Sequence, residues 1–235
     1  MFKFARLKTA LYLLVCFAIV ATTSACGGTP TGPGSTGRVA ITATLAGGTL
    51  ISPQETILSL RIDVRDAAGS TVGSPVIVPV SSSGATFTAE VELAAGENRD
   101  ITVLAIGTRP VADSSDGSDA GTGVLYRGAL TGVNATAGAT TARAVTLDTF
   151  VPKLEPLEMA GSGVRVRWAA VSGAERYVLT RYYDGVGFTT TPLTDTSFVD
   201  DTGASRYQAI AIEKSGRPSA PSDFRVATTA ARAQR

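Results

Sequence analysis

Histidine is absent from this chain of 235 residues, and cysteine, aromatic residues and excess charge are all scarce. Without an imidazole, the chain lacks the side chain that serves most often as a general base and as a metal ligand. This excludes a large share of hydrolases and of zinc enzymes. The 21 Lys and Arg residues against 20 Asp and Glu residues give a formal net charge of +1. A charge so close to zero argues against nucleic acid as a partner, because such binding needs a basic surface.

The first 25 residues have the three parts of an export signal. Three basic residues, Lys3, Arg6 and Lys8, precede an apolar run at residues 10–21, and small residues follow up to Ala25. The run has twelve residues, whereas a membrane-spanning helix needs about 20. The sequence therefore predicts a signal peptide over residues 1–25, cleaved between Ala25 and Cys26.

The two cysteines lie on opposite sides of this cleavage point. Cys16 belongs to the signal, so the mature chain keeps only Cys26 and forms no internal disulfide. The stretch Thr23-Ser24-Ala25-Cys26 resembles the lipobox of bacterial lipoproteins, with Thr23 in place of the usual Leu. The resemblance implies that Cys26 carries fatty acyl chains such as palmitate. With Gly27 as the next residue, it implies an anchor in the outer membrane. Ordinary signal peptidase also accepts Thr23-Ser24-Ala25, so a secreted protein with a free thiol is the alternative.

Composition divides the rest of the chain into a linker, two patterned regions and a tail. Residues 27–37 consist only of Gly, Pro, Ser and Thr, which predicts that residues 26–37 form a flexible, extended linker behind the lipidated cysteine. Prolines at 152 and 156 mark a boundary between the two patterned regions. We expect domains at residues 38–149 and 150–228, followed by a disordered tail at residues 229–235.

The first region alternates apolar and polar residues about every dozen positions, which is the pattern of half-buried strands. Val39, Ile41, Ala43 and Leu45 form one inward-facing set, and Leu58, Leu60, Ile62 and Val64 form another; Phe87, Ala89, Val91 and Leu93 form a third. Pro75 and Pro79 place their strand at a sheet edge. The predicted fold is all-β, with an antiparallel sandwich of immunoglobulin-like or transthyretin-like arrangement.

The second region resembles a fibronectin type III domain. The matching segments are residues 164–168, which place the single Trp, residues 174–179, residues 196–200 and residues 207–212. The resemblance implies a second β-sandwich in tandem, with Trp168, Tyr177 and Tyr207 as core markers. It also implies that the Tyr207 hydroxyl satisfies a backbone group at a corner of the sandwich.

Few residue patterns carry chemistry. Asp113, Asp116 and Asp119 lie within seven residues and form a calcium candidate, with a solvated loop tip as the alternative. Tyr182, Tyr183 and Phe188 form an aromatic hairpin that would contact a sugar or a protein, or else pack on neighbouring loops. The sequence predicts no catalytic residue and no cofactor.

These features lead to three hypotheses on function. The first is a non-enzymatic lipoprotein of the bacterial cell envelope, held to the membrane by its lipid, whose sandwich modules contact an envelope protein or a polysaccharide. The second is a carbohydrate-binding or adhesion accessory module. The third, an envelope enzyme that uses carboxylate chemistry, has no catalytic constellation in its support.

Overall fold

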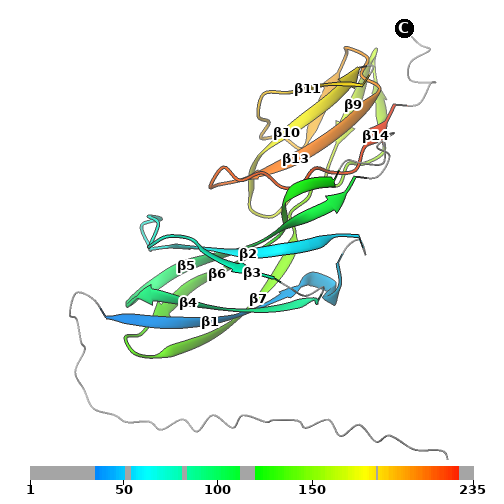
Figure 1. The fold of residues 1–235 in the computed structure, drawn as a ribbon. Helices are drawn as coiled ribbons and strands as arrows, with labels where there is room; N and C mark the ends of the chain where they lie inside the picture. Colours follow the sequence, from blue (N-terminus) through cyan, green and yellow to red (C-terminus); the bar gives the residue numbers. More distant parts are fainter. Residues whose placement is uncertain (1–34, 51–53, 81–83, 112–119, 184, 228–235) are drawn as a thin grey trace, which may run out of the picture. The chain divides into compact units, whose positions relative to one another are not determined.

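The computed structural model describes residues 35–50, 54–80, 84–111, 120–183 and 185–227. Within these ranges the regular structure is almost entirely strand, in a group β1 to β7 and a group β8 to β14 (Figure 1). This confirms the predicted all-β class. The described residues contain no helix long and apolar enough to cross a membrane.

The first sandwich contains seven strands. They are β1 (Thr36–Leu45), β2 (Thr56–Arg65), β3 (Val76–Pro79), β4 (Thr86–Ala94), β5 (Gly96–Pro110), β6 (Ala120–Ala135) and β7 (Thr140–Thr149), with a short 3-10 turn at Ala46–Gly48. Their order is β3-β2-β5-β6-β7-β1-β4. Since β6 pairs with β7 at only two positions, β4-β1-β7 and β3-β2-β5-β6 form two layers around a core (Figure 1). All pairs are antiparallel except β1 with β7, which is parallel.

The core of this sandwich contains most of the side chains that alternation places inward. All four predicted residues of β1 and all four of β4 are buried, and β3 lies at a sheet edge. Leu58 is the exception, because it is 49% exposed while Ile57 is buried. The register between β2 and β5 shifts between Ile57 and Ser59, and such a bulge reverses the face that the following residues present. The prediction that Leu58 faces the core was therefore wrong.

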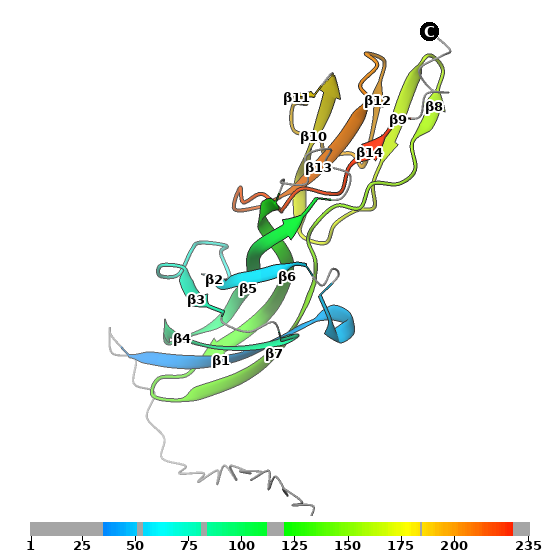
Figure 2. The same cartoon turned by 45° about the vertical axis from the view of Figure 1, so that its right-hand side comes forward.

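The second sandwich is built from β8 (Glu158–Ala160), β9 (Gly163–Arg167), β10 (Ala174–Tyr183), β11 (Val186–Thr189), β12 (Ser197–Asp200), β13 (Arg206–Glu213) and β14 (Arg225–Val226). One sheet has the order β12-β9-β8 and the other β11-β10-β13-β14, and the two layers are visible in Figure 2. A three-stranded sheet on a four-stranded sheet is the arrangement expected from the fibronectin type III resemblance.

Three aromatic residues occupy the core between these two sheets. Trp168, Tyr177 and Tyr207 are all buried, and the rings of Trp168 and Tyr177 meet edge to face with centroids 5.5 Å apart. The Tyr177 hydroxyl accepts a hydrogen bond from the backbone N–H of Val171 at 2.8 Å. The indole N–H of Trp168 is buried without a hydrogen-bond partner, so this ring stabilises the core through its apolar area and its contact with Tyr177.

The expected ends of the linker and of the first domain can be compared with the strands and buried residues of the structure. β1 begins at Thr36, inside the segment expected to be linker, because Thr36 and Gly37 already pair with Ala94 and Leu93 of β4. Phe150, at the expected start of the second domain, is buried in a core cluster shared with Leu104 of β5. The described residues of both sandwiches belong to one compact unit.

Candidate functional site

Several predicted site residues lie outside the part of the chain that the structure describes. Ala25 and Cys26, the predicted cleavage and lipidation point, precede residue 35, and Asp113, Asp116 and Asp119 fall between the described residues 111 and 120. Among the described residues, no group of three or more Cys, Asp or Glu side chains is placed to hold a metal ion.

The predicted aromatic hairpin is split over two faces of its sheet. The ring of Tyr183 meets that of Phe188 edge to face at 5.6 Å. Tyr182, the next residue along β10, instead meets Phe224 at 5.2 Å, and Arg206 lies over both of these rings. Successive strand residues point to opposite faces, so Tyr182 does not share a surface with Tyr183 and Phe188. Phe188 is 51% exposed and is the member of this pair that solvent reaches most.

Asp200, at the end of β12, is a fully buried carboxylate surrounded by donors. Its Oδ1 accepts hydrogen bonds from Arg181 Nη1 at 3.1 Å and from the backbone N–H and hydroxyl of Thr202. Its Oδ2 accepts from the Tyr207 hydroxyl at 2.7 Å and from the N–H of Ala204 at 3.2 Å. Burial alone would raise the pKa of Asp200, but the hydrogen bonds from Thr202, Tyr207 and Ala204 outweigh it and hold that pKa below the ordinary value of 3.8.

The resemblance to fibronectin type III domains implied that the Tyr207 hydroxyl bonds a backbone group at this corner. In the structure it bonds the side chain of Asp200 instead. The Tyr207 hydroxyl donates to the carboxylate of Asp200, which stands at the opposite end of the short loop before β13. Asp200 in turn accepts hydrogen bonds from two backbone N–H groups of that loop. The carboxylate thus links the tyrosine to the loop backbone.

The segment between β13 and β14 runs beside β6 of the first sandwich. The N–H of Val124 donates to the carbonyl of Pro218 at 3.2 Å, and the N–H of Ala220 donates to the carbonyl of Val124 at 3.1 Å. At Gly121 and Gly123 a Cβ atom would collide with Pro221 and with the backbone at Ala220. Glycine at these two positions permits this close backbone approach.

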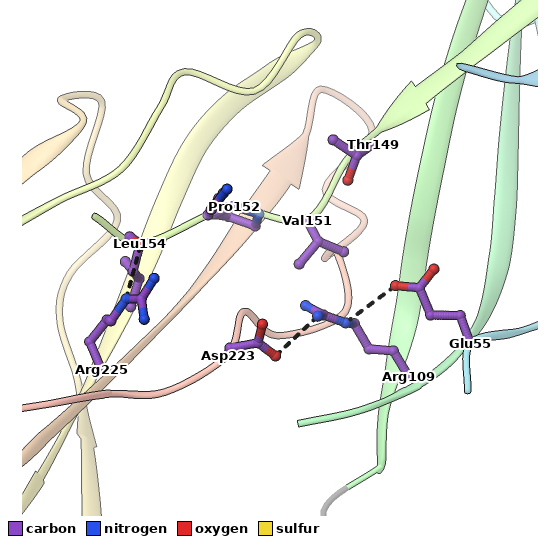
Figure 3. Close-up of a pocket in the computed structure, with 9 residues that line it drawn as sticks. Glu55, Arg109, Thr149, Val151, Pro152, Leu154, Asp223 and Arg225 are labelled. Atoms are coloured by element: carbon purple, nitrogen blue, oxygen red, sulfur yellow. Dashed lines mark hydrogen bonds and ion pairs between the residues drawn. The ribbon is translucent and has the colours of Figure 1, made fainter. Parts of the chain in front are cut away.

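A buried arginine joins the two sandwiches beside this contact. Arg109, at the end of β5, places Nε 3.5 Å from Glu55 Oε1 and Nη2 3.0 Å from Asp223 Oδ1 (Figure 3). Its Nη1 donates to the carbonyl of Pro221 at 3.2 Å. Glu55 also accepts a hydrogen bond of 2.6 Å from the hydroxyl of Tyr126. The positive charge of Arg109 therefore lies between two carboxylates from opposite modules.

A pocket of about 200 Å³, here called the junction pocket, opens next to Arg109. Its apolar wall comes from the connector between β7 and β8, and its charged side chains come from both modules (Figure 3). The wall consists of Val151, Pro152 and Leu154, and the charged residues are Glu55, Arg109, Lys153, Asp223 and Arg225. Arg225 is fixed by a hydrogen bond of 3.0 Å from its Nε to the carbonyl of Leu154.

No pattern in the sequence indicates this pocket. Glu55, Arg109 and Asp223 are far apart along the chain and lie in no motif, and each alone reads as an ordinary surface charge. Only the folded contact between the modules brings them within ion-pair distance.

No family model and no curated protein matches the chain. Among solved structures, a Fn3-like protein from Clostridium thermocellum is 24% identical over 31% of this chain and 84% of its own, with a TM-score of 0.26. The tip fimbrial protein Mfa3 from Porphyromonas gingivalis is 10% identical over 78% of this chain and 80% of its own, at 0.34. A fimbrial assembly protein from Parabacteroides distasonis is 9% identical over 82% and 86%, at 0.32. All three TM-scores are below 0.5.

Proposed function

We propose that this protein is a non-catalytic, lipid-anchored contact module of the bacterial cell envelope. Cys26 holds the chain to the outer membrane, residues 27–35 space it from the bilayer, and the joined sandwiches contact an envelope protein or polymer. The lipobox-like stretch and the Gly, Pro, Ser and Thr linker support the anchor.

The observation that carries the non-catalytic assignment is the state of the buried carboxylates. Among the described residues these are Glu55, Asp200 and Glu213. Glu55 is paired with Arg109 and Tyr126, and Asp200 with Arg181 and Tyr207. Glu213 accepts the N–H of Ser215 at 2.6 Å and lies 3.9 Å from Arg127. A carboxylate whose oxygens are occupied by structural donors is poorly placed to move a substrate proton.

The contact between the modules supports a role in binding. Backbone hydrogen bonds at Val124 and the Arg109 ion pairs connect the two sandwiches, so loops of both modules are held in one arrangement. A pre-organised surface loses less conformational entropy on binding a partner than two modules that reorient freely would lose.

The anchor is tested by metabolic labelling of cells with an alkyne fatty acid. The wild-type protein is expected to carry the label and to fractionate with the outer membrane, whereas Cys26→Ala loses both properties. Cys16→Ala is the matched control and keeps both, because that residue leaves with the signal. Equal labelling and fractionation of wild type and Cys26→Ala would refute the anchor.

A second candidate function, carbohydrate binding, is favoured by one observation: Phe188 exposes half of its surface beside the ring of Tyr183. The exposed ring of Phe188 presents apolar area on which a sugar would stack, whereas the Tyr183 hydroxyl donates to Asp200 Oδ1 at 3.5 Å. A glycan array with wild type and Phe188→Ala tests it. Sugar binding that Phe188→Ala abolishes supports this candidate, and an array without hits removes it.

A further inference from the structure

The junction pocket is lined by more positive than negative side chains. Three cationic side chains, Arg109, Lys153 and Arg225, and two carboxylates, Glu55 and Asp223, line the pocket, an excess of one positive charge. Both carboxylates are engaged by Arg109. Among the described residues, Lys153 and Arg225 form no ion pair with any carboxylate.

The geometry of Arg225 leaves its charge available to a ligand. Its Nε is bonded to the carbonyl of Leu154, which fixes the orientation of the guanidinium beside the apolar wall of the pocket (Figure 3). A guanidinium presents planar donors that match the two oxygens of a carboxylate. Lys153, which is exposed on the neighbouring connector, adds a second positive charge.

The aliphatic wall and the volume of the junction pocket limit the size and kind of ligand that carries the anionic group. Val151, Pro152 and Leu154 supply aliphatic surface, and the pocket contains no aromatic ring on which a sugar would stack. A volume of about 200 Å³ lies below the range of roughly 300 to 1,000 Å³ of pockets that enclose a whole small-molecule ligand. The pocket therefore suits one carboxylate on a short aliphatic stem.

We infer that the junction pocket binds an acidic side chain, Glu or Asp, of a protein partner in the cell envelope. The methylene stem packs on Val151 and Leu154, and the carboxylate meets Arg225 and Lys153. This inference rests on the proposed contact function and names the chemistry of the partner. Because the pocket takes residues from both modules, binding depends on their contact.

The test uses the full chain in detergent micelles with labelled Val and Leu methyl groups, observed by NMR. The probe is N-acetyl-glutamate N-methylamide, and its glutamine analogue is the neutral control. We expect the glutamate probe to shift the methyl signals of Val151 and Leu154 with a roughly millimolar dissociation constant, and the glutamine analogue to leave them unchanged. Raising the salt concentration weakens this binding, because Lys153 is exposed and Arg225 is partly exposed to solvent.

Matched variants assign the effect to the pocket. Lys153→Gln and Arg225→Gln are each expected to weaken the glutamate probe about tenfold, which is the scale of one charged hydrogen bond. Arg225→Lys keeps the charge and retains part of the affinity. Lys214→Gln, an exposed lysine on the turn after β13, leaves it unchanged.

Three results would overturn the inference: no methyl shift with the glutamate probe, equal shifts with the glutamine analogue, or tighter binding of galacturonate at the same methyl groups. The last would indicate an acidic polysaccharide. None of these results affects the lipid-labelling test, so failure of the pocket assignment and failure of the envelope assignment are distinguishable.

Discussion

Replacing Asp200 with Asn removes the buried negative charge at a corner of the second sandwich while keeping the shape of the side chain. The carboxylate offers two acceptor oxygens, but the amide offers one oxygen and one NH₂ group. If the NH₂ group takes the place of Oδ2, the N–H of Ala204 loses its acceptor. If it takes the place of Oδ1, the N–H of Thr202 loses its acceptor and Arg181 loses its partner. In either orientation at least one backbone donor loses its bond to this side chain.

The size of the effect follows from these losses. A buried donor left without an acceptor costs about 1 to 3 kcal/mol, and breaking a buried ion pair from one side costs about 3 to 5 kcal/mol. We expect Asp200→Asn to lower the free energy of unfolding by about 3 to 5 kcal/mol at pH 7. Urea unfolding followed by far-UV circular dichroism measures it. Asp195→Asn, at an exposed position five residues upstream in the segment before β12, is the control and stays within about 0.5 kcal/mol of wild type.

The same variant has a defined pH signature. Because the pKa of Asp200 is held below 3.8 in the folded protein, its ionised form stabilises the fold fully above the unfolded-state pKa of about 3.9. That stabilisation is lost as the pH falls through the lower, folded-state pKa. The gap between wild type and Asp200→Asn should therefore shrink at about pH 3. A loss below about 1 kcal/mol at pH 7, or a gap of equal size at both pH values, would refute this account.

Two further stability predictions follow from the cores and from the contact between the modules. Trp168→Ala should cost about 3 to 5 kcal/mol; Trp168→Phe should cost less, because it refills most of the volume and removes the unpaired indole N–H. Gly173 has φ +80°, and a Cβ there would collide with the guanidinium of Arg127. We expect Gly173→Ala to cost about 1 to 2 kcal/mol through backbone strain, plus the loss of the Arg127 contact with Glu213.

A matched control for Gly173→Ala is present in the chain. Gly69 has nearly the same φ, +81°, but an added Cβ there meets nothing within 4 Å. Gly69→Ala therefore measures backbone strain alone, and the excess loss in Gly173→Ala measures the collision with Arg127. Equal losses in the two alanine variants would show that this collision is harmless. A loss below about 2 kcal/mol for Trp168→Ala would contradict a core role for the ring.

Much of the fold was predictable because strand burial is a local pattern. Alternation predicted the inward sets of β1 and β4, and prolines placed β3 at an edge. Leu58 shows the limit of this reasoning, since a single bulge in the pairing of β2 with β5 moved it to the surface. A register shift is decided by the partner strand, which the local sequence does not contain.

The sequence by itself determined the all-β class and the alternating core positions of β1 and β4, because these depend on the order of apolar residues along each strand. Its resemblance to fibronectin type III domains indicated the aromatic residues of the second sandwich. The tertiary structure alone decided the pairing of Arg109 with Glu55 and Asp223 and the pocket beside them. These residues meet only where β5, the start of β2 and the segment before β14 converge. Interactions between charges act over a few ångströms in space, whatever their separation along the chain.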